Sequence, residues 1–170
     1  MRCPTNGAGL GLLEIARISD IGLQWKWIEN REELDLSARI DTGVVVTNIS
    51  VSRGPVTLGI EGDAETGTVS LSGSSYPEDA FVFFESITNW IESYFDTDPK
   101  TFTLVCEIDH LNSSSSKSLF DLLDMVEHHA PVGCKSSVIW RHPAIDPDMR
   151  IVGEEFAEDV TIPFTFEETE

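Results

Sequence analysis

Four consecutive serines, Ser113 to Ser116, are the residues of this sequence best suited to carry chemistry. An apolar run from Phe102 to Ile108 precedes them and reads as a strand, and Lys117 to His129 has the pattern of a helix. The hydroxyls therefore lie where a strand turns into a helix. The first amides of a helix have no intrahelical acceptors, and the helix dipole adds positive charge there. Such a position suits a capping serine, and it also suits a phosphate, whether bound or attached to a side chain.

Catalytic chemistry at these serines has little support in the sequence. A serine hydrolase would need its nucleophile in a G-x-S-x-G turn, and no glycine flanks Ser113 to Ser116. Neither G-x-x-x-x-G-K-[ST] nor G-x-G-x-x-G occurs, so nucleotide binding has no motif. We therefore expect no catalytic residue, no cofactor and no metal site. A small metal-dependent hydrolase that uses Asp109, His110 and His142 stays open as an alternative.

The charge and cysteine content limit the partners and the compartment. The net charge is −19, which argues against binding to nucleic acid or to an anionic membrane surface. No apolar run reaches the length of a transmembrane helix. Cys3, Cys106 and Cys134 are odd in number and widely spaced, so they make no disulfide framework. A reducing, cytoplasmic setting fits these features best.

The acidic charge divides the chain into parts. Residues 1–55 are nearly neutral, whereas the rest carries almost all of the negative charge. We expect 1–55 to be an extension of unassigned structure that ends at Gly54-Pro55. Residues 56–166 form the predicted domain, and 167–170 form an acidic, loose tail.

Alternating strand and helix patterns predict an α/β fold. Strands are expected at 56–60, 68–72, 102–108, 137–140 and 162–166, and helices at 81–95, 117–129 and 149–159. Ser75 and Glu78 have the spacing of a capping box for the first helix, whose core face would carry Phe81 and Phe84. His142 to Asp148 is expected to be a loop. The order β-β-α-β-α-β-α-β predicts a sheet with parallel neighbours and helices packed on it.

Three stretches in this order match a known family. They are residues 73–78 (GSSYPE), residues 111–117 (LNSSSSK), and Trp140 followed by 154–159 (EEFAED) and Pro163-Phe164. Together they resemble the SiaC family of bacterial regulatory phosphoproteins, linked to biofilm and cyclic-di-GMP control, over about residues 56–166. The resemblance implies a STAS-like mixed sheet and a switch protein that is not an enzyme.

The resemblance also implies a modification site and partners. In the family, a cognate kinase phosphorylates a threonine in an Asn-Thr-Ser-Ser-x-Lys motif, and a PP2C-type phosphatase removes the phosphate. The unphosphorylated form binds and activates a diguanylate cyclase. Asn112 and Lys117 fix the register, so Ser113 falls on the modified position, with Ser114 and Ser115 as alternates. The implied partner-binding residues are Asn112, Ser114, Ser115, Lys117 and Tyr76. An anti-sigma-factor antagonist with a transcriptional partner is the second reading of the same resemblance.

Overall fold

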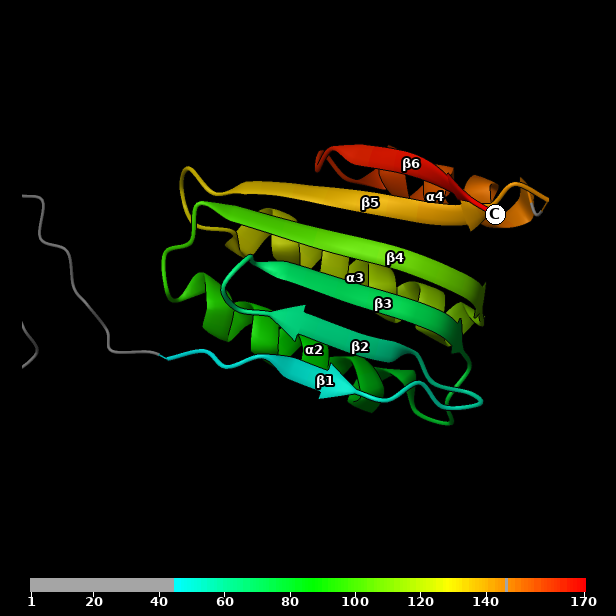
Figure 1. Ribbon diagram of the computed structural model, residues 1–170, viewed down its shortest axis with the longest axis horizontal. Coiled ribbons are helices and arrows are strands. Elements are labelled where there is room, and N and C mark those ends of the chain that lie inside the picture. The colour runs from blue at the N-terminus through cyan, green and yellow to red at the C-terminus, as the bar shows by residue number, and fades with distance from the viewer. Residues whose placement is uncertain (1–44, 146) are drawn as a thin grey trace, which may run out of the picture. The chain divides into compact units, whose positions relative to one another are not determined.

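The computed structural model describes residues 45–145 and 147–170, which form one mixed sheet and three helices (Figure 1). The elements in chain order are β1 (Ile49–Val51), β2 (Gly59–Asp63), β3 (Thr68–Ser75), α2 (Ala80–Phe95), β4 (Thr101–Leu111), α3 (Ser113–His129), β5 (Lys135–Pro143), α4 (Pro147–Asp159) and β6 (Phe164–Thr169). The predicted α/β class and the predicted order of elements are confirmed, with β1 added at the front. No helix within the described residues is long and apolar enough to span a membrane.

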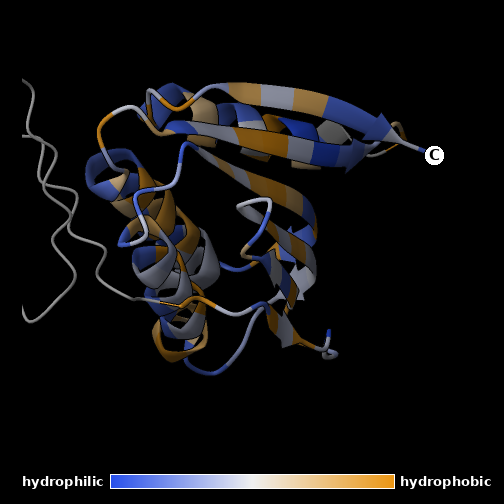
Figure 2. Ribbon diagram, turned by 60° about the vertical axis from the view of Figure 1, so that its left-hand side comes forward, coloured by the Kyte–Doolittle hydropathy of each residue, from blue (hydrophilic) through white to orange (hydrophobic). Residues whose placement is uncertain are grey.

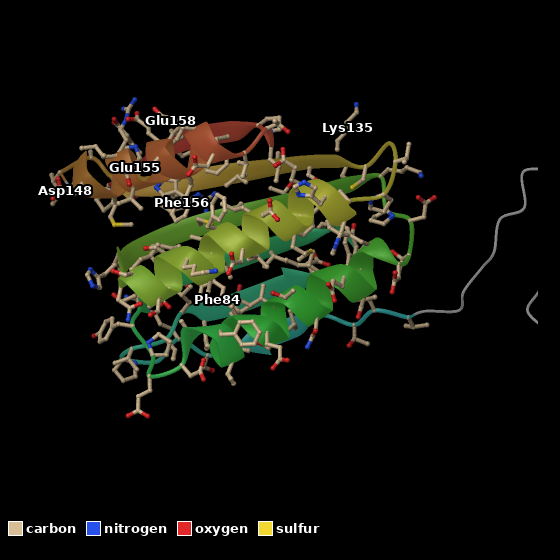
Figure 3. The ribbon with its side chains drawn as sticks, turned by 180° about the vertical axis from the view of Figure 1, so that it is seen from behind. Phe84, Lys135, Asp148, Glu155, Phe156 and Glu158 are labelled. Atoms are coloured by element: carbon tan, nitrogen blue, oxygen red, sulfur yellow. The ribbon has the colours of Figure 1, made fainter. Side chains whose placement is uncertain are left out.

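The sheet follows the order of the sequence from β1 to β6. Strands β1, β2 and β3 are antiparallel, whereas β3 to β6 are parallel neighbours joined through α2, α3 and α4. Crossovers of this kind are right-handed, so connections that always step in one direction place their helices on one face. Figures 1 and 3 show all three helices on the same face of the sheet. The starts of the helices and the carboxyl ends of β3 to β6 therefore meet at one edge.

The core lies between the sheet and the helices. Strand residues alternate between apolar and polar along the sheet, as the bands in Figure 2 show. The helix-facing members include Leu104, Ile108 and Trp140, which are almost fully buried. Leu119, Leu122, Leu123 and Val126 of α3 pack against them, as their spacing predicts.

The bounds of the sheet differ from the prediction at both ends. Strand β1 lies within the segment set apart as an extension, yet Ile49 pairs with Gly62 of β2, so the sheet begins before residue 56. Residues 1–44 lie outside the described residues. Strand β6 runs through Glu167 to Thr169 and pairs with β5, so most of the predicted acidic tail is strand. The same pairing holds His142 and Pro143 in β5, where a loop was expected.

The predicted capping box is also wrong. Ser75 ends β3 and is fully buried, because β3 continues past a register shift at Gly73 and Ser74 and pairs with β4 as far as Leu111. Helix α2 is capped instead by Asp79, whose side chain accepts a hydrogen bond of 3.1 Å from the amide of Val82.

Candidate functional site

The start of α3 is a capped helix terminus. Asn112 has an extended backbone, and its Oδ1 accepts a hydrogen bond of 2.8 Å from the amide of Ser115. The amide of Ser116 donates the first helical bond to the carbonyl of Asn112, also at 2.8 Å. Ser113 is therefore the first helical residue. The helix begins four residues before the predicted Lys117 because Asn112, and not a serine, is the cap.

The four serines occupy different environments. Ser113 and Ser114 are exposed, Ser116 is half-buried and Ser115 is fully buried. Residues on a helix turn by about 100° per position, so successive hydroxyls point in different directions. A modifying enzyme can reach Ser113 and Ser114. The alternate site Ser115 is out of reach in this structure.

The buried serine anchors the helix start to the sheet. Ser75 Oγ donates a hydrogen bond of 2.9 Å to Ser115 Oγ, and the amide of Asn112 donates to the carbonyl of Ser75 at 3.0 Å. These bonds satisfy polar groups that would be costly to bury alone. They fix the start of α3, and with it the exposed residue Ser113, relative to the sheet. Sequence reasoning missed this role of Ser75, because its spacing to Glu78 favoured a cap.

Lys117 lies on the same helix face as Ser113, because residues four apart are neighbours on a helix. Its Nζ lies 2.7 Å from a carboxylate oxygen of Asp121, one turn further on. Both side chains are more than half exposed, so this ion pair is weak. A phosphate on Ser113 would compete with Asp121 for the same ammonium group.

Tyr76 lies beside the end of β4. Its ring contacts the His110 ring edge-on, with centroids 5.8 Å apart, and its hydroxyl donates to the carbonyl of Pro55 at 3.0 Å. The neighbouring carboxylate of Asp109 forms an ion pair with Arg53. The predicted site residues Asn112, Ser113 and Tyr76 are thus brought to the same edge of the sheet. Sequence reasoning missed Arg53, because it preceded the expected domain boundary and no local pattern marked it.

The residues proposed for a metal-dependent hydrolase do not form a cluster. Asp109 is paired with Arg53, and His142 is buried in β5 with its Nδ1 3.3 Å from the carbonyl oxygen of Pro143. Within the described residues, the group close enough to hold a metal is a different one, on α3: Asp124, Glu127 and His128. Two members of that group already form hydrogen bonds within the protein. The amide of Thr161 donates to Glu127 at 2.8 Å, and His128 Nδ1 donates to the carbonyl of Asp124 at 2.8 Å.

Comparison with known proteins assigns the chain to a family. The profile of the "SiaC family regulatory phosphoprotein" matches residues 54–169, which include the start of α3, Tyr76 and all strands except β1. The chain belongs to the SiaC family. The matched range agrees closely with the stretch over which the resemblance was seen in the sequence. The more specific STAS-like description of the fold stays a prediction.

Proteins of Pseudomonas aeruginosa are among those similar to this SiaC family protein. An uncharacterised protein of strain UCBPP-PA14 is 31% identical over 108 residues, which cover 64% of this chain and 86% of the relative. The crystal structure of apo-SiaC is similar with a TM-score of 0.65 at 29% identity, over 71% of this chain and 98% of that one. SiaC is also solved in complex with the diguanylate cyclase SiaD, of which it is the activator. That SiaC chain is similar with a TM-score of 0.66 at 29% identity, over 71% of this chain and 99% of its own.

Proposed function

We propose that this SiaC family protein is a switch, not an enzyme, which binds and activates a diguanylate cyclase while Ser113 is unmodified and releases it when Ser113 is phosphorylated. The observation that carries the proposal is that Ser113 is exposed at the first position of a capped helix whose start is hydrogen-bonded to the sheet. The activator role of SiaC toward SiaD in the solved complex supports the choice of a cyclase as partner.

The local helix tolerates the phosphate. Phosphorylation adds a charge of about −1.5 to −2 at neutral pH, and a negative charge in the first helical turn is stabilising by roughly 0.3–1 kcal/mol. Lys117 offers a nearby cation. The modification therefore leaves α3 folded, and its effect falls on whatever partner covers Ser113. A dianion that must lose its water to enter an interface opposes binding.

The switch needs enzymes that add and remove the phosphate. We propose a cognate serine/threonine kinase and a PP2C-type phosphatase, both acting in the cytoplasm. A serine hydroxyl accepts phosphate by the same chemistry as the threonine of the family motif. The exposure of Ser113 gives both enzymes access, whereas the buried Ser115 gives none.

The test measures binding with the phosphate installed at one chosen residue. Protein carrying genetically encoded phosphoserine at position 113 is compared with unmodified protein, using calorimetry against the purified diguanylate cyclases of the same organism. Ser113→Ala should bind as the unmodified chain does, and Ser113→Asp should bind more weakly. Phosphoserine at position 113 should weaken binding at least about tenfold, which corresponds to about 1.4 kcal/mol.

Phosphoserine at position 114 is the matched control, because Ser114 is exposed and adjacent but turned by about 100° around the helix. Equal weakening by both modifications would show a general effect of charge and would contradict the assignment to Ser113. Binding to no cyclase at all would refute the proposed partner. Mapping of the natural phosphate to a residue other than Ser113 would refute the proposed site.

A further inference from the structure

The outer edge of β6 has no strand beside it among the described residues (Figure 1). Strand β6 pairs with β5 on one side and ends the sheet. It is six residues long, whereas β1 at the opposite edge has three. The free side of an edge strand presents unpaired N–H and C=O groups, which form a template for another strand. Of the two edges, that of β6 therefore offers the longer template.

The hydrogen bonds of β6 show which of its main-chain groups are free. The carbonyls of Pro163 and Thr169 accept hydrogen bonds of 2.9 and 3.2 Å from amides of β5 and of the residue that follows it. Because main-chain groups alternate in direction along a strand, the odd-numbered residues of β6 point their N–H and C=O groups toward β5. The N–H and C=O groups of Phe164, Phe166 and Glu168 therefore point away from the sheet.

The apolar layer between helices and sheet is incomplete at this edge. Phe164 and Phe166 are half-buried, and their ring centroids lie 6.1 Å apart. They lie on the helix face, because they pair with the buried residues Val138 and Trp140 of β5. Phe156 of α4 packs on Trp140, with ring centroids 5.7 Å apart, so α4 lies over β5 and not beyond β6. A strand added to β6 would cover the two exposed ring edges.

A second copy of the chain fits this edge. Two β6 strands that run antiparallel about a two-fold axis at Phe166 place Phe166 opposite itself, and each outward-pointing residue then lies in a hydrogen-bonded pair. In this register Glu168 lies opposite Phe164, and Glu167 lies opposite Thr165, so no two glutamates are directly opposite. Registers centred on Glu167 or Glu168 would oppose identical carboxylates, which is destabilising. The spacing of apolar and acidic residues in β6 thus favours one register of self-pairing.

We propose that the outer edge of β6 is a self-association site, at which two copies pair antiparallel about Phe166 and join their sheets. The inference goes beyond the proposed function. The two-fold axis is perpendicular to the sheet, so the helices of both copies stay on one face of the joined sheet. The edges that carry Ser113 then point in opposite directions. A dimer of this kind leaves both Ser113 residues open and can hold two partner molecules at once.

The charge of the chain determines how this dimer responds to salt. Each copy carries a net charge of −19, so two copies repel each other at low ionic strength. Salt screens this repulsion, whereas it leaves main-chain hydrogen bonds and ring contacts in place. The dimer should therefore strengthen as salt is added. A basic strand from another protein would show the opposite dependence, because salt would weaken its attraction to the acidic chain.

The experiment is sedimentation equilibrium of the full, unmodified chain from micromolar to millimolar concentration, at low and high salt. We expect a monomer–dimer equilibrium that shifts toward dimer at high salt. Glu168→Pro removes an outward-pointing N–H group, which an edge strand tolerates in the monomer. It should weaken the dimer at least about tenfold, because the symmetry removes one hydrogen bond from each copy. Glu168→Gln is the matched control, because it removes the same charge and keeps the N–H group, and its dimer should be as strong or stronger.

Hydrogen exchange by NMR tests the same contact without a substitution. The amides of Phe166 and Glu168 should exchange more slowly as the protein concentration rises, whereas the amide of Glu167, which points toward β5, should be protected at every concentration. A chain that stays monomeric at all concentrations and salts would overturn the proposal. So would equal association of Glu168→Pro and Glu168→Gln, because the contact would then lie on another surface. A monomeric chain that still binds a cyclase in a manner dependent on Ser113 would overturn this inference and leave the proposed function intact.

Discussion

Replacing Asn112 by alanine tests how the start of α3 is held. The Asn112 side chain accepts one hydrogen bond, from the amide of Ser115 at 2.8 Å. In Asn112→Ala that amide loses its acceptor at the end of a helix whose next residues are packed on the sheet. Removal of an N-cap asparagine costs about 1 kcal/mol, in a range of roughly 0.5–2 kcal/mol. For a domain of this size, 1 kcal/mol corresponds to a fall in melting temperature of about 3–5 °C.

The assay is thermal and urea unfolding of the full chain, followed by circular dichroism. Asn112→Asp keeps an acceptor and adds a negative charge at the helix start, so it should be as stable as the unmodified protein or more so. Asn89→Ala is the matched control, since Asn89 is an exposed asparagine in the interior of α2. It should be neutral or slightly stabilising, because alanine is the better helix former. Equal stability of Asn112→Ala and Asn89→Ala would refute the capping role.

Three further predictions concern the core and one surface histidine. Gly153→Ala should lower the melting temperature although alanine favours helices, because its methyl group would lie 2.6 Å from the fully buried Trp140 ring. Iodoacetamide at pH 8 should leave Cys106 unlabelled in the native protein by mass spectrometry, since burial raises the pKa of its thiol to about 12. The pKa of His128 should exceed 6.5 by NMR, first because its ring donates to the backbone carbonyl of Asp124 and then because of the Asp124 carboxylate. The protonated His128 ring therefore stabilises the folded state below pH 6.5, and this contribution is lost as the pH rises through the raised pKa. A measured pKa at or below 6.5 would contradict these contacts of His128 with Asp124.

The sequence predicts most of the fold because its signals are local. The spacing of Leu119, Leu122 and Val126 defines a helix, and the apolar run from Phe102 to Ile108 defines a buried strand. Each signal needs only neighbours in the chain. The alternation of strands and helices then determines that neighbouring strands run parallel and that the helices cover one face of the sheet.

The errors arise where a distant residue decides the local structure. Ser75 has the spacing of a helix cap. Its pairing with Leu111 of β4 and its hydrogen bond to Ser115, 40 residues away, keep it in the sheet. Glu167 lies in a charged terminal stretch, but pairing with β5 and an ion pair of 2.9 Å to Arg141 hold it in β6. Phe81 follows the apolar pattern of α2, yet it lies outside the buried stripe and is exposed.

The resemblance to the SiaC family singles out Ser113, but the local sequence does not predict which of the four serines are exposed. A strand followed by a polar run and a helix places all four hydroxyls near the helix start. The helix phase then decides which of them is exposed, and that phase depends on Asn112 being the cap and on the bond between Ser75 and Ser115. The structure leaves Ser113 and Ser114 accessible and removes Ser115.

The most direct test of the account is the rate at which the purified cyclase converts GTP to cyclic-di-GMP, titrated with this protein in its two states. The unmodified chain is expected to raise the rate with a saturable dependence on concentration. Protein with phosphoserine at position 113 is expected to leave the rate at its basal value over the same concentrations, and treatment with a PP2C-type phosphatase should restore activation. Equal activation by the modified and unmodified chains would contradict the central claim.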